Sequence, residues 1–164
     1  MEIHIAPARP YETQDVAEVL QEAGRWLEQK GIPLWSQQEV APPGIAATVA
    51  SGQYILARDA SGAPVGAFRL HEDDPSVWPD AVPGESLFIH HMALVRREAG
   101  KGLAQAMLAW AMKETKNRGK KFLRLDLLAD RSKLRAVYEH CGFRHHSDRQ
   151  VGPRLLARYE FTVR

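Results

Sequence analysis

The sequence has one cysteine, no long apolar run and only a small excess of charge. A lone Cys141 cannot form an intramolecular disulfide or a multi-cysteine metal site, which agrees with a reducing compartment and argues against redox chemistry. No window approaches the roughly 18 uninterrupted apolar residues of a membrane span, and the start M-E-I-H-I-A-P does not resemble a signal peptide. We therefore expect a cytoplasmic protein without a membrane partner.

The charge pattern also argues against nucleic acid as a partner. The net charge is +2, and the basic residues are scattered or form short clusters such as Arg118, Lys120 and Lys121 rather than a continuous stripe. With 164 residues, 45% hydrophobic and 26% charged, the composition is that of a globular protein. We expect a single domain over residues 1–164, without repeats or linkers.

Hydrophobic periodicity predicts a mixed α/β fold with helices packed on a central sheet. Gly and Pro punctuate the pattern, and P-P-G at positions 42–44 is interpreted as a break before a short helix. Residues 71–84 carry three prolines and predict an exposed loop. The expected order is a strand at 2–6, a helix between Pro10 and Gly31, a helix ending near Ser51, strands at 54–58, 65–70 and 86–95, a helix from Leu103 to Arg118, a strand at 121–128, a helix ending before Gly142, and strands at about 143–150 and 155–163.

The segment R-R-E-A-G-K-G-L-A follows a predicted strand and opens a predicted helix. The first N–H groups of a helix have no intrahelical acceptor, and the helix dipole adds partial positive charge, so an anion is stabilised there. Gly100 and Gly102 would let the backbone approach that anion closely. From the glycines alone, a plain turn between strand and helix is an equal alternative.

The segment does not match the residue spacing of two other known phosphate-binding loops. A Walker loop needs Gly-x-x-x-x-Gly-Lys-Ser/Thr, and the dinucleotide fingerprint needs a small residue where this chain has Gln105. The pattern Gln/Arg-x-x-Gly-x-Gly/Ala does fit, through Arg97, Gly100 and Gly102. On this motif the chain resembles the GNAT superfamily of N-acetyltransferases. H-M-A-L-V is similar to the end of the family's fourth strand, and the run from Ala129 to Phe143 is similar to its Asn-x-x-Ala-x-x-x-Tyr-x-x-x-Gly-Phe element.

The resemblance covers nearly the whole chain and implies a sheet of about seven strands with about four helices and a splayed fourth and fifth strand. It implies acetyl-CoA as co-substrate, with pyrophosphate on the loop amides and pantetheine between the splayed strands. Arg131 and Leu134 depart from the motif, which has Asn and Ala there. The implied coenzyme-binding residues are Met92, Ala93, Leu94, Arg97, Glu98, Ala99, Gly100, Lys101, Gly102, Leu103, Ala104, Arg131 and Tyr138.

Acyl transfer from a thioester requires a proton donor for the thiolate and a base for the amine. Tyr138 aligns with the family's tyrosine acid, and a phenol with a pKa near ~10 keeps its proton at neutral pH. Packing on the apolar face of its helix is the alternative. His90 is our candidate for the base, because H-H-M-A-L resembles the His-x-Leu-Ala-Val stretch of arylalkylamine N-acetyltransferases. The alternative for His90 is a buried or coenzyme-packing residue.

Other residues complete the expected site. Resemblance makes the backbone N–H of Met92 or Leu94 the oxyanion donor. Adjacent strand residues point to opposite faces, so His90 and His91 should diverge, and His145 and His146 should not form a metal site. No metal is expected.

The acceptor is expected to be the amine of a small molecule with an apolar body. Trp26, Trp35 and Trp78 belong to segments that cover the acceptor side in the family, and core packing is their alternative. An acidic stretch could favour a cationic ligand, although a solvated loop explains it equally well. The competing functions are transfer to a peptide acceptor and coenzyme binding without catalysis. The resemblance to the family also leads us to expect a homodimer. The acidic residues are Glu72, Asp73, Asp74, Asp80 and Glu85.

Overall fold

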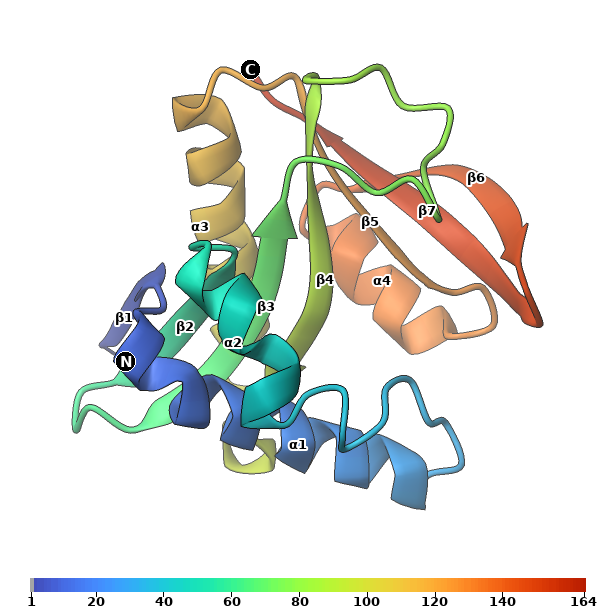
Figure 1. Cartoon of the computed structure of the whole chain (residues 1–164). Coiled ribbons are helices and arrows are strands. Elements are labelled where there is room, and N and C mark those ends of the chain that lie inside the picture. Colours follow the sequence, from blue (N-terminus) through green and yellow to red (C-terminus); the bar gives the residue numbers. More distant parts are fainter. Residues whose placement is uncertain (1) are drawn as a thin grey trace. The chain divides into compact units, whose positions relative to one another are not determined.

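The structure is a computed structural model that describes residues 2–164 (Figure 1). Within this range the chain forms seven strands and four α-helices, with two short 3-10 helices. The strands are β1 (Ile3–Pro7), β2 (Tyr54–Asp59), β3 (Pro64–His71), β4 (Ser86–Leu94), β5 (Phe122–Leu128), β6 (Arg144–Val151) and β7 (Arg154–Thr162). The helices are α1 (Thr13–Gln29), α2 (Pro42–Ala50), α3 (Leu103–Asn117) and α4 (Ser132–His140), with η1 (Pro10–Glu12) and η2 (Arg96–Glu98).

The sheet has the strand order β1-β2-β3-β4-β5-β7-β6 and mixes two pairing directions. Strands β1 and β2, β2 and β3, β5 and β7, and β6 and β7 pair antiparallel. Strands β4 and β5 pair parallel from Ser86↔Phe122 to Phe88↔Arg124. This parallel pair fits the predicted splay of the fourth and fifth strands, and the predicted mixed sheet with four helices is confirmed.

Residue contacts group the chain into two compact units, each made of two segments. The first runs to Arg69 and resumes over His91–Met107, and the second combines Leu70–His90 with Leu108–Arg164. Strands β3 and β4 and helix α3 each pass from one unit into the other. A single domain over the whole chain stays a prediction.

Helix α1 supplies much of the core of the first unit through a stripe at helical spacing. Val16, Val19, Leu20 and Ala23 are buried, as the period of about 3.6 residues predicts. Helix α2 differs from the prediction, because P-P-G does not precede the helix but starts it at Pro42. Proline is compatible with the first helical turn, where its missing N–H would have no acceptor and its fixed φ is already helical.

The second unit has a core cluster that includes two residues of the predicted exposed loop, Val77 and Trp78. Trp78, which lies between β3 and β4, is only 3% exposed and packs with Val77, Phe88 and Leu156. The guanidinium groups of Arg124 and Arg158 lie 4.7 and 4.6 Å from its ring. The predicted irregular backbone is confirmed, but the predicted exposure is wrong for this residue, because a proline-rich segment can still bury a large aromatic side chain.

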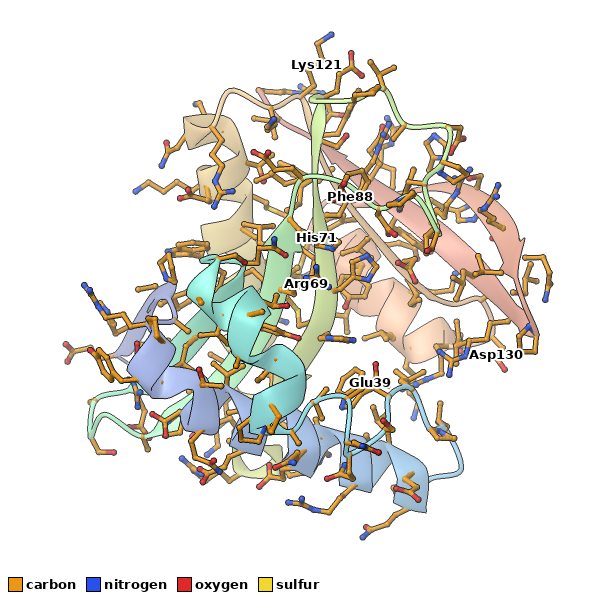
Figure 2. The ribbon with its side chains drawn as sticks, in the orientation of Figure 1. Glu39, Arg69, His71, Phe88, Lys121 and Asp130 are labelled. Carbon is orange, nitrogen blue, oxygen red and sulfur yellow. The ribbon has the colours of Figure 1, made fainter. Side chains whose placement is uncertain are left out.

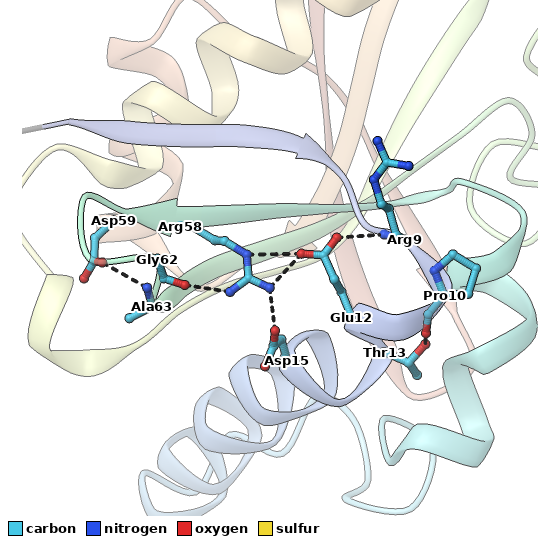
Figure 3. A network of polar contacts seen from close by, with 9 residues as sticks. All are labelled: Arg9, Pro10, Glu12, Thr13, Asp15, Arg58, Asp59, Gly62 and Ala63. Atoms are coloured by element: carbon cyan, nitrogen blue, oxygen red, sulfur yellow. Dashed lines mark hydrogen bonds and ion pairs between the residues drawn. The ribbon is translucent and has the colours of Figure 1, made fainter.

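A charged network joins α1 to β2 in the first unit (Figure 3). The Arg58 guanidinium donates to Glu12 Oε2 at 2.6 Å and to Asp15 Oδ2 at 2.5 Å, and it also donates to the Gly62 carbonyl at 2.7 Å. The Arg9 backbone N–H donates to Glu12 Oε1 at 3.0 Å. Hydrogen bonds to charged groups are among the stronger ones, so this network fixes the start of α1 against the sheet.

We expect Arg58→Met to lower the free energy of unfolding by about 1–3 kcal/mol at pH 7, because it leaves two carboxylates without their partner. Burial alone would raise the pKa of Glu12, but hydrogen bonds from Arg9 and Arg58 outweigh it and leave the pKa below its ordinary 4.5. A depressed carboxyl pKa stabilises the fold above the unfolded pKa, and this contribution is lost as pH falls through the folded pKa. The difference between wild type and variant should therefore shrink below that range.

Urea unfolding at pH 7 and pH 3.5 measures this difference. Arg118→Met is the matched control, because Arg118, directly after α3, makes a surface pair at 3.0 Å with Glu114, four residues earlier. Such pairs contribute about 0.3–0.5 kcal/mol. Equal losses for the two variants would show that the Arg58 network has no special role.

Candidate functional site

The glycine loop connects β4 to α3 through two glycines of positive φ. It leaves β4 at Leu94, passes through η2 and enters α3 at Leu103. Gly100 and Gly102 have φ of +77° and +88°, a region that favours glycine. A Cβ at either position would meet no atom within 4 Å, so backbone conformation and not crowding requires glycine here. The first N–H groups of a helix such as α3 have no acceptor within the helix, and an anion is stabilised at such a terminus.

Hydrogen bonds hold the start of this loop in place. The Val95 N–H donates to the Val65 carbonyl at 2.9 Å, and the Arg96 N–H donates to Glu22 Oε2 at 3.0 Å. The Arg96 guanidinium lies 3.8 Å from the centroid of Trp26 on α1. These contacts fix the backbone from which the glycine loop starts. The role of Glu22 was missed, because no pattern in the sequence links it to a position 74 residues away.

The remaining loop residues divide into an exposed and a buried set. The Arg97 side chain is 55% exposed, with its guanidinium 3.7 Å from Asp59. Glu98 is buried, and its Oε2 lacks a hydrogen-bond partner within the described residues. Ala99, Gly100, Lys101 and Gly102 are exposed, whereas Leu103 is buried. The exposed residues are those that a ligand could reach.

The end of β4 departs from regular strand geometry. His91 has a φ of +52°, which is uncommon for a residue other than glycine and is frequent at functional sites. The positive φ interrupts the regular strand at His91, and nothing in the sequence signals it. The two histidines contact different residues, in agreement with the predicted divergence of their side chains. Beyond it, Ala93 is buried while Met92 and Leu94 are partly exposed.

His91 lies in an aromatic cluster of the first unit. Its Nδ1 is 2.9 Å from the Tyr54 hydroxyl, and its ring lies edge-on to Trp35 with centroids 5.2 Å apart. Burial raises the pKa of Tyr54 to about 12, so the phenol keeps its proton and can donate it to His91. Trp35 itself donates from Nε1 to the Leu20 carbonyl at 2.9 Å. This cluster fixes the ring of His91, which the sequence did not single out.

In the second unit His90 lies between two carboxylates. Its Nε2 is 2.7 Å from Asp74 Oδ2, and its Nδ1 is 3.8 Å from Asp126 Oδ1. His71, on β3, is 4.7 Å from the His90 ring and 6.3 Å from the Phe88 ring, measured between centroids, and Figure 2 labels His71 and Phe88. Burial raises the pKa of Asp126, Asp74 adds to the shift, and His90 opposes it.

The same three side chains place ligand atoms within 4.8 Å of one another, as a metal site would. The 2.7 Å contact between Asp74 and His90 is a hydrogen-bond distance. The absence of a metal stays a prediction. In the other histidine pair, His145 contacts Asp148 at 2.8 Å and His146 contacts Ser147 at 2.8 Å. The His145 ring also meets Tyr159, and the His146 ring meets Trp78.

Tyr138 is 8% exposed on α4, and its ring meets Phe143 edge-on with centroids 5.9 Å apart. Burial raises the pKa of Tyr138 to about 12, the negative charge of Asp126 adds to the shift, and Arg131 opposes it. The phenol therefore stays protonated at neutral pH. Arg131 begins α4 as its N-cap residue. The structure thus gives Tyr138 both a packing contact and the protonation state of an acid.

The candidate acceptor residues differ in how they are placed. Trp26 contacts Arg96 of the glycine loop, and Trp35 contacts His91, whereas Trp78 is buried in its core cluster. Trp78 therefore offers no ring surface to a ligand in this conformation.

The acidic stretch mostly serves the fold. Asp80 pairs with Arg158 at 2.8 Å, Glu85 pairs with Lys121 at 3.0 Å, and Glu72 lies 3.8 Å from Lys120. Asp74 binds His90. Intramolecular pairing leaves little charge for attracting a cationic ligand, which weakens that expectation.

A strand that runs into a positive-φ glycine loop at a helix start, within a mixed seven-strand sheet, is the arrangement that the resemblance to the GNAT acetyltransferases implies. Residues 16–143 match the model of the acetyltransferase (GNAT) family, and the chain belongs to this family. The resemblance inferred from the sequence is thereby confirmed.

Three relatives illustrate the likeness. The uncharacterized N-acetyltransferase YesJ of Bacillus subtilis strain 168 is 27% identical over 147 residues, which are 85% of this chain and 81% of that protein. A GNAT-family acetyltransferase of Listeria monocytogenes 4b F2365 superposes with a TM-score of 0.83 at 19% identity, over 99% of this chain and 96% of that one. The PaiA N-acetyltransferase of Thermoplasma acidophilum, in complex with coenzyme A, has a TM-score of 0.77 at 16% identity over 99% of both chains.

The two structural likenesses establish the fold alone. None of the helices within residues 2–164 combines the length and the apolar character needed to cross a membrane.

Proposed function

We propose that this protein transfers the acetyl group of acetyl-CoA to the primary amine of a small molecule by direct attack in a ternary complex. The observation that carries the proposal is the glycine loop, because Gly100 and Gly102 hold a positive-φ turn at the start of α3. Such a turn presents backbone N–H groups to a pyrophosphate. The coenzyme-bound PaiA relative and the family match support the same co-substrate.

The loop from Arg97 to Ala104 would bind the pyrophosphate, and Met92, Ala93 and Leu94 would pair with the pantetheine through their backbone. Acetyl-CoA supplies the acetyl group as a thioester. A backbone N–H of Met92 or Leu94 would stabilise the oxyanion, as preorganised donors do in acyl transfer. Arg131 stands where the family motif has Asn, so we assign it no contact beyond the start of α4.

The residues of the second unit would move the protons. An ammonium acceptor loses two protons on the way to an amide. His90 would accept the first and release it to solvent. Tyr138 would give its proton to the departing thiolate and regain one from the nitrogen that has formed the new bond. The pKa of Tyr138, raised to about 12 by burial, keeps this donor protonated at the pH where amines are acetylated.

Trp35 and Trp26 are our candidates for contacts with the acceptor. Trp35 packs on His91 at the end of β4, and aromatic rings there favour an acceptor with an apolar body. We omit Trp78, because it is buried. Action in the cytoplasm is supported by the lone Cys141, and the homodimer stays a prediction.

A thiol-release assay with acetyl-CoA tests the proposal against polyamines, arylalkylamines, aminoglycosides, amino acids and short peptides. Calorimetry with coenzyme A alone runs beside it. Acceptor-dependent thiol release with a small amine would support the proposal, and release only with peptides would replace the acceptor class. Tight binding without turnover on the whole panel would favour a non-catalytic binding protein, and a lack of coenzyme binding would refute the loop assignment.

A further inference from the structure

We infer that Asp74 and Asp126 are positioning residues that make His90 a base, with Asp74 selecting the ring nitrogen that accepts the proton and Asp126 stabilising the imidazolium that forms. The inference rests on the proposed function, in which His90 deprotonates the acceptor. All three side chains belong to the second unit. They come from the loop after β3, from β4 and from β5.

We assign the tautomer of the neutral ring from its contact with Asp74. An ionised carboxylate accepts hydrogen bonds and cannot donate them, so the 2.7 Å contact requires a hydrogen on Nε2 of His90. Neutral imidazole has one N–H, which leaves the lone pair on Nδ1. Asp74 is only 8% exposed and also accepts from the Val77 backbone N–H at 3.4 Å, so this carboxylate is fixed in place. The base is therefore held by an orienting carboxylate, as in other Asp-His pairs.

The contact with Asp126 explains where charge is stabilised. Its Oδ1 is buried, has no hydrogen-bond partner among the described residues, and lies 3.8 Å from His90 Nδ1. That distance is too long for a hydrogen bond to neutral imidazole, but it is close for an attraction between imidazolium and carboxylate. An opposite charge at this range favours the protonated ring. Asp126 therefore strengthens His90 as a base for an alkylammonium group.

Other titratable and charged groups surround these three side chains. His71 faces the His90 ring from β3. Asp126 interacts with Asp74, with Arg154 on β7 and with Tyr138 on α4, as well as with His90. Arg154 attracts Asp126, and Asp74 repels it.

The proton transfer is balanced. The acceptor R-NH3+ gives one proton to His90 Nδ1 and becomes R-NH2, which can attack the thioester. His90 becomes imidazolium, with Nε2–H bound to Asp74 and Nδ1–H facing Asp126. The imidazolium then returns its proton to solvent.

Asp126→Asn tests the inference, because it keeps the shape of the side chain and removes its charge. We expect the acid limb of the pH profile of kcat/KM to move to lower pH by about 1–3 units, the usual effect of a charge at this range. We expect the plateau of kcat to fall, since His90 becomes a weaker base. Asp126→Glu should restore most of the acid limb and of the kcat plateau. Asp73→Asn neutralises an exposed neighbour of Asp74 and should change neither the acid limb nor the plateau.

A second readout does not need activity. Nitrogen-15 spectra of labelled histidine report the titration midpoint and tautomer of His90, whose signals are identified by their loss in His90→Gln. Asp126→Asn should lower the midpoint, and Asp74→Asn should lower it and also mix the tautomers. An unchanged midpoint and tautomer in both variants would overturn the inference. The expected spectra with no acetyl transfer would instead leave the inference intact and refute the proposed function.

Discussion

Replacement of Tyr138 by Phe should lower kcat by about 10²- to 10⁴-fold, the range that a positioned acid contributes, and leave coenzyme affinity unchanged. The variant removes one oxygen. Its ring keeps the edge-on contact with Phe143 at 5.9 Å, so the fold should lose little stability. A thiolate left without a donor is a poor leaving group, and the loss should therefore appear in turnover. Thiol release measures kcat, and calorimetry with coenzyme A measures affinity.

Tyr11→Phe is the matched control, because Tyr11 is 82% exposed in η1 and should affect neither quantity. Unchanged turnover in Tyr138→Phe would mean that this tyrosine only packs on its helix and that another group protonates the thiolate. A parallel loss of coenzyme affinity would mean that the hydroxyl binds the coenzyme before it takes part in the chemistry.

The order of elements could be predicted from the sequence, because each one carries its own local pattern. The spacing of Val16, Leu20 and Ala23 predicts helix α1. The turn at Gly152 and Pro153 predicts the pair of strands β6 and β7. The error at α2 came from treating proline as a break where it starts the helix. The burial of Trp78 was missed because it depends on residues more than 70 positions later, such as Leu156.

The candidate site shows the same limit. Gly100, Gly102 and Tyr138 lie in contiguous motifs and could be identified by reading along the chain. Asp74 and Asp126 could not, because neither spacing nor motif links a loop carboxylate and a strand carboxylate to His90. The positive φ of His91 could not be predicted either, because histidine adopts positive φ too rarely for the residue type to indicate it. Long-range pairs of this kind come only with the tertiary structure.

Coenzyme affinity should fall by about 30- to 700-fold when Gly100 and Gly102 are both replaced by Ala. Both have positive φ, at +77° and +88°, and a side chain there costs about 1–2 kcal/mol per residue. There is open space at both positions, so the loop can relieve the strain by changing its backbone rather than by unfolding the protein. Binding of the coenzyme must then restore the turn that presents the N–H groups. The strain at the two residues together costs about 2–4 kcal/mol of binding free energy, which corresponds to the stated loss of affinity.

The matched control is the double variant of Gly31 and Gly52 to Ala. These glycines have φ of +76° and +80°, and a Cβ at either one would also meet no atom within 4 Å, but they follow α1 and α2 instead of preceding α3. The control should lose stability on thermal unfolding and bind coenzyme A as wild type does. If both double variants weakened coenzyme binding equally, general strain would explain the loss. If neither did, the amides of this loop would not hold the pyrophosphate, because their conformation is what the two glycines maintain.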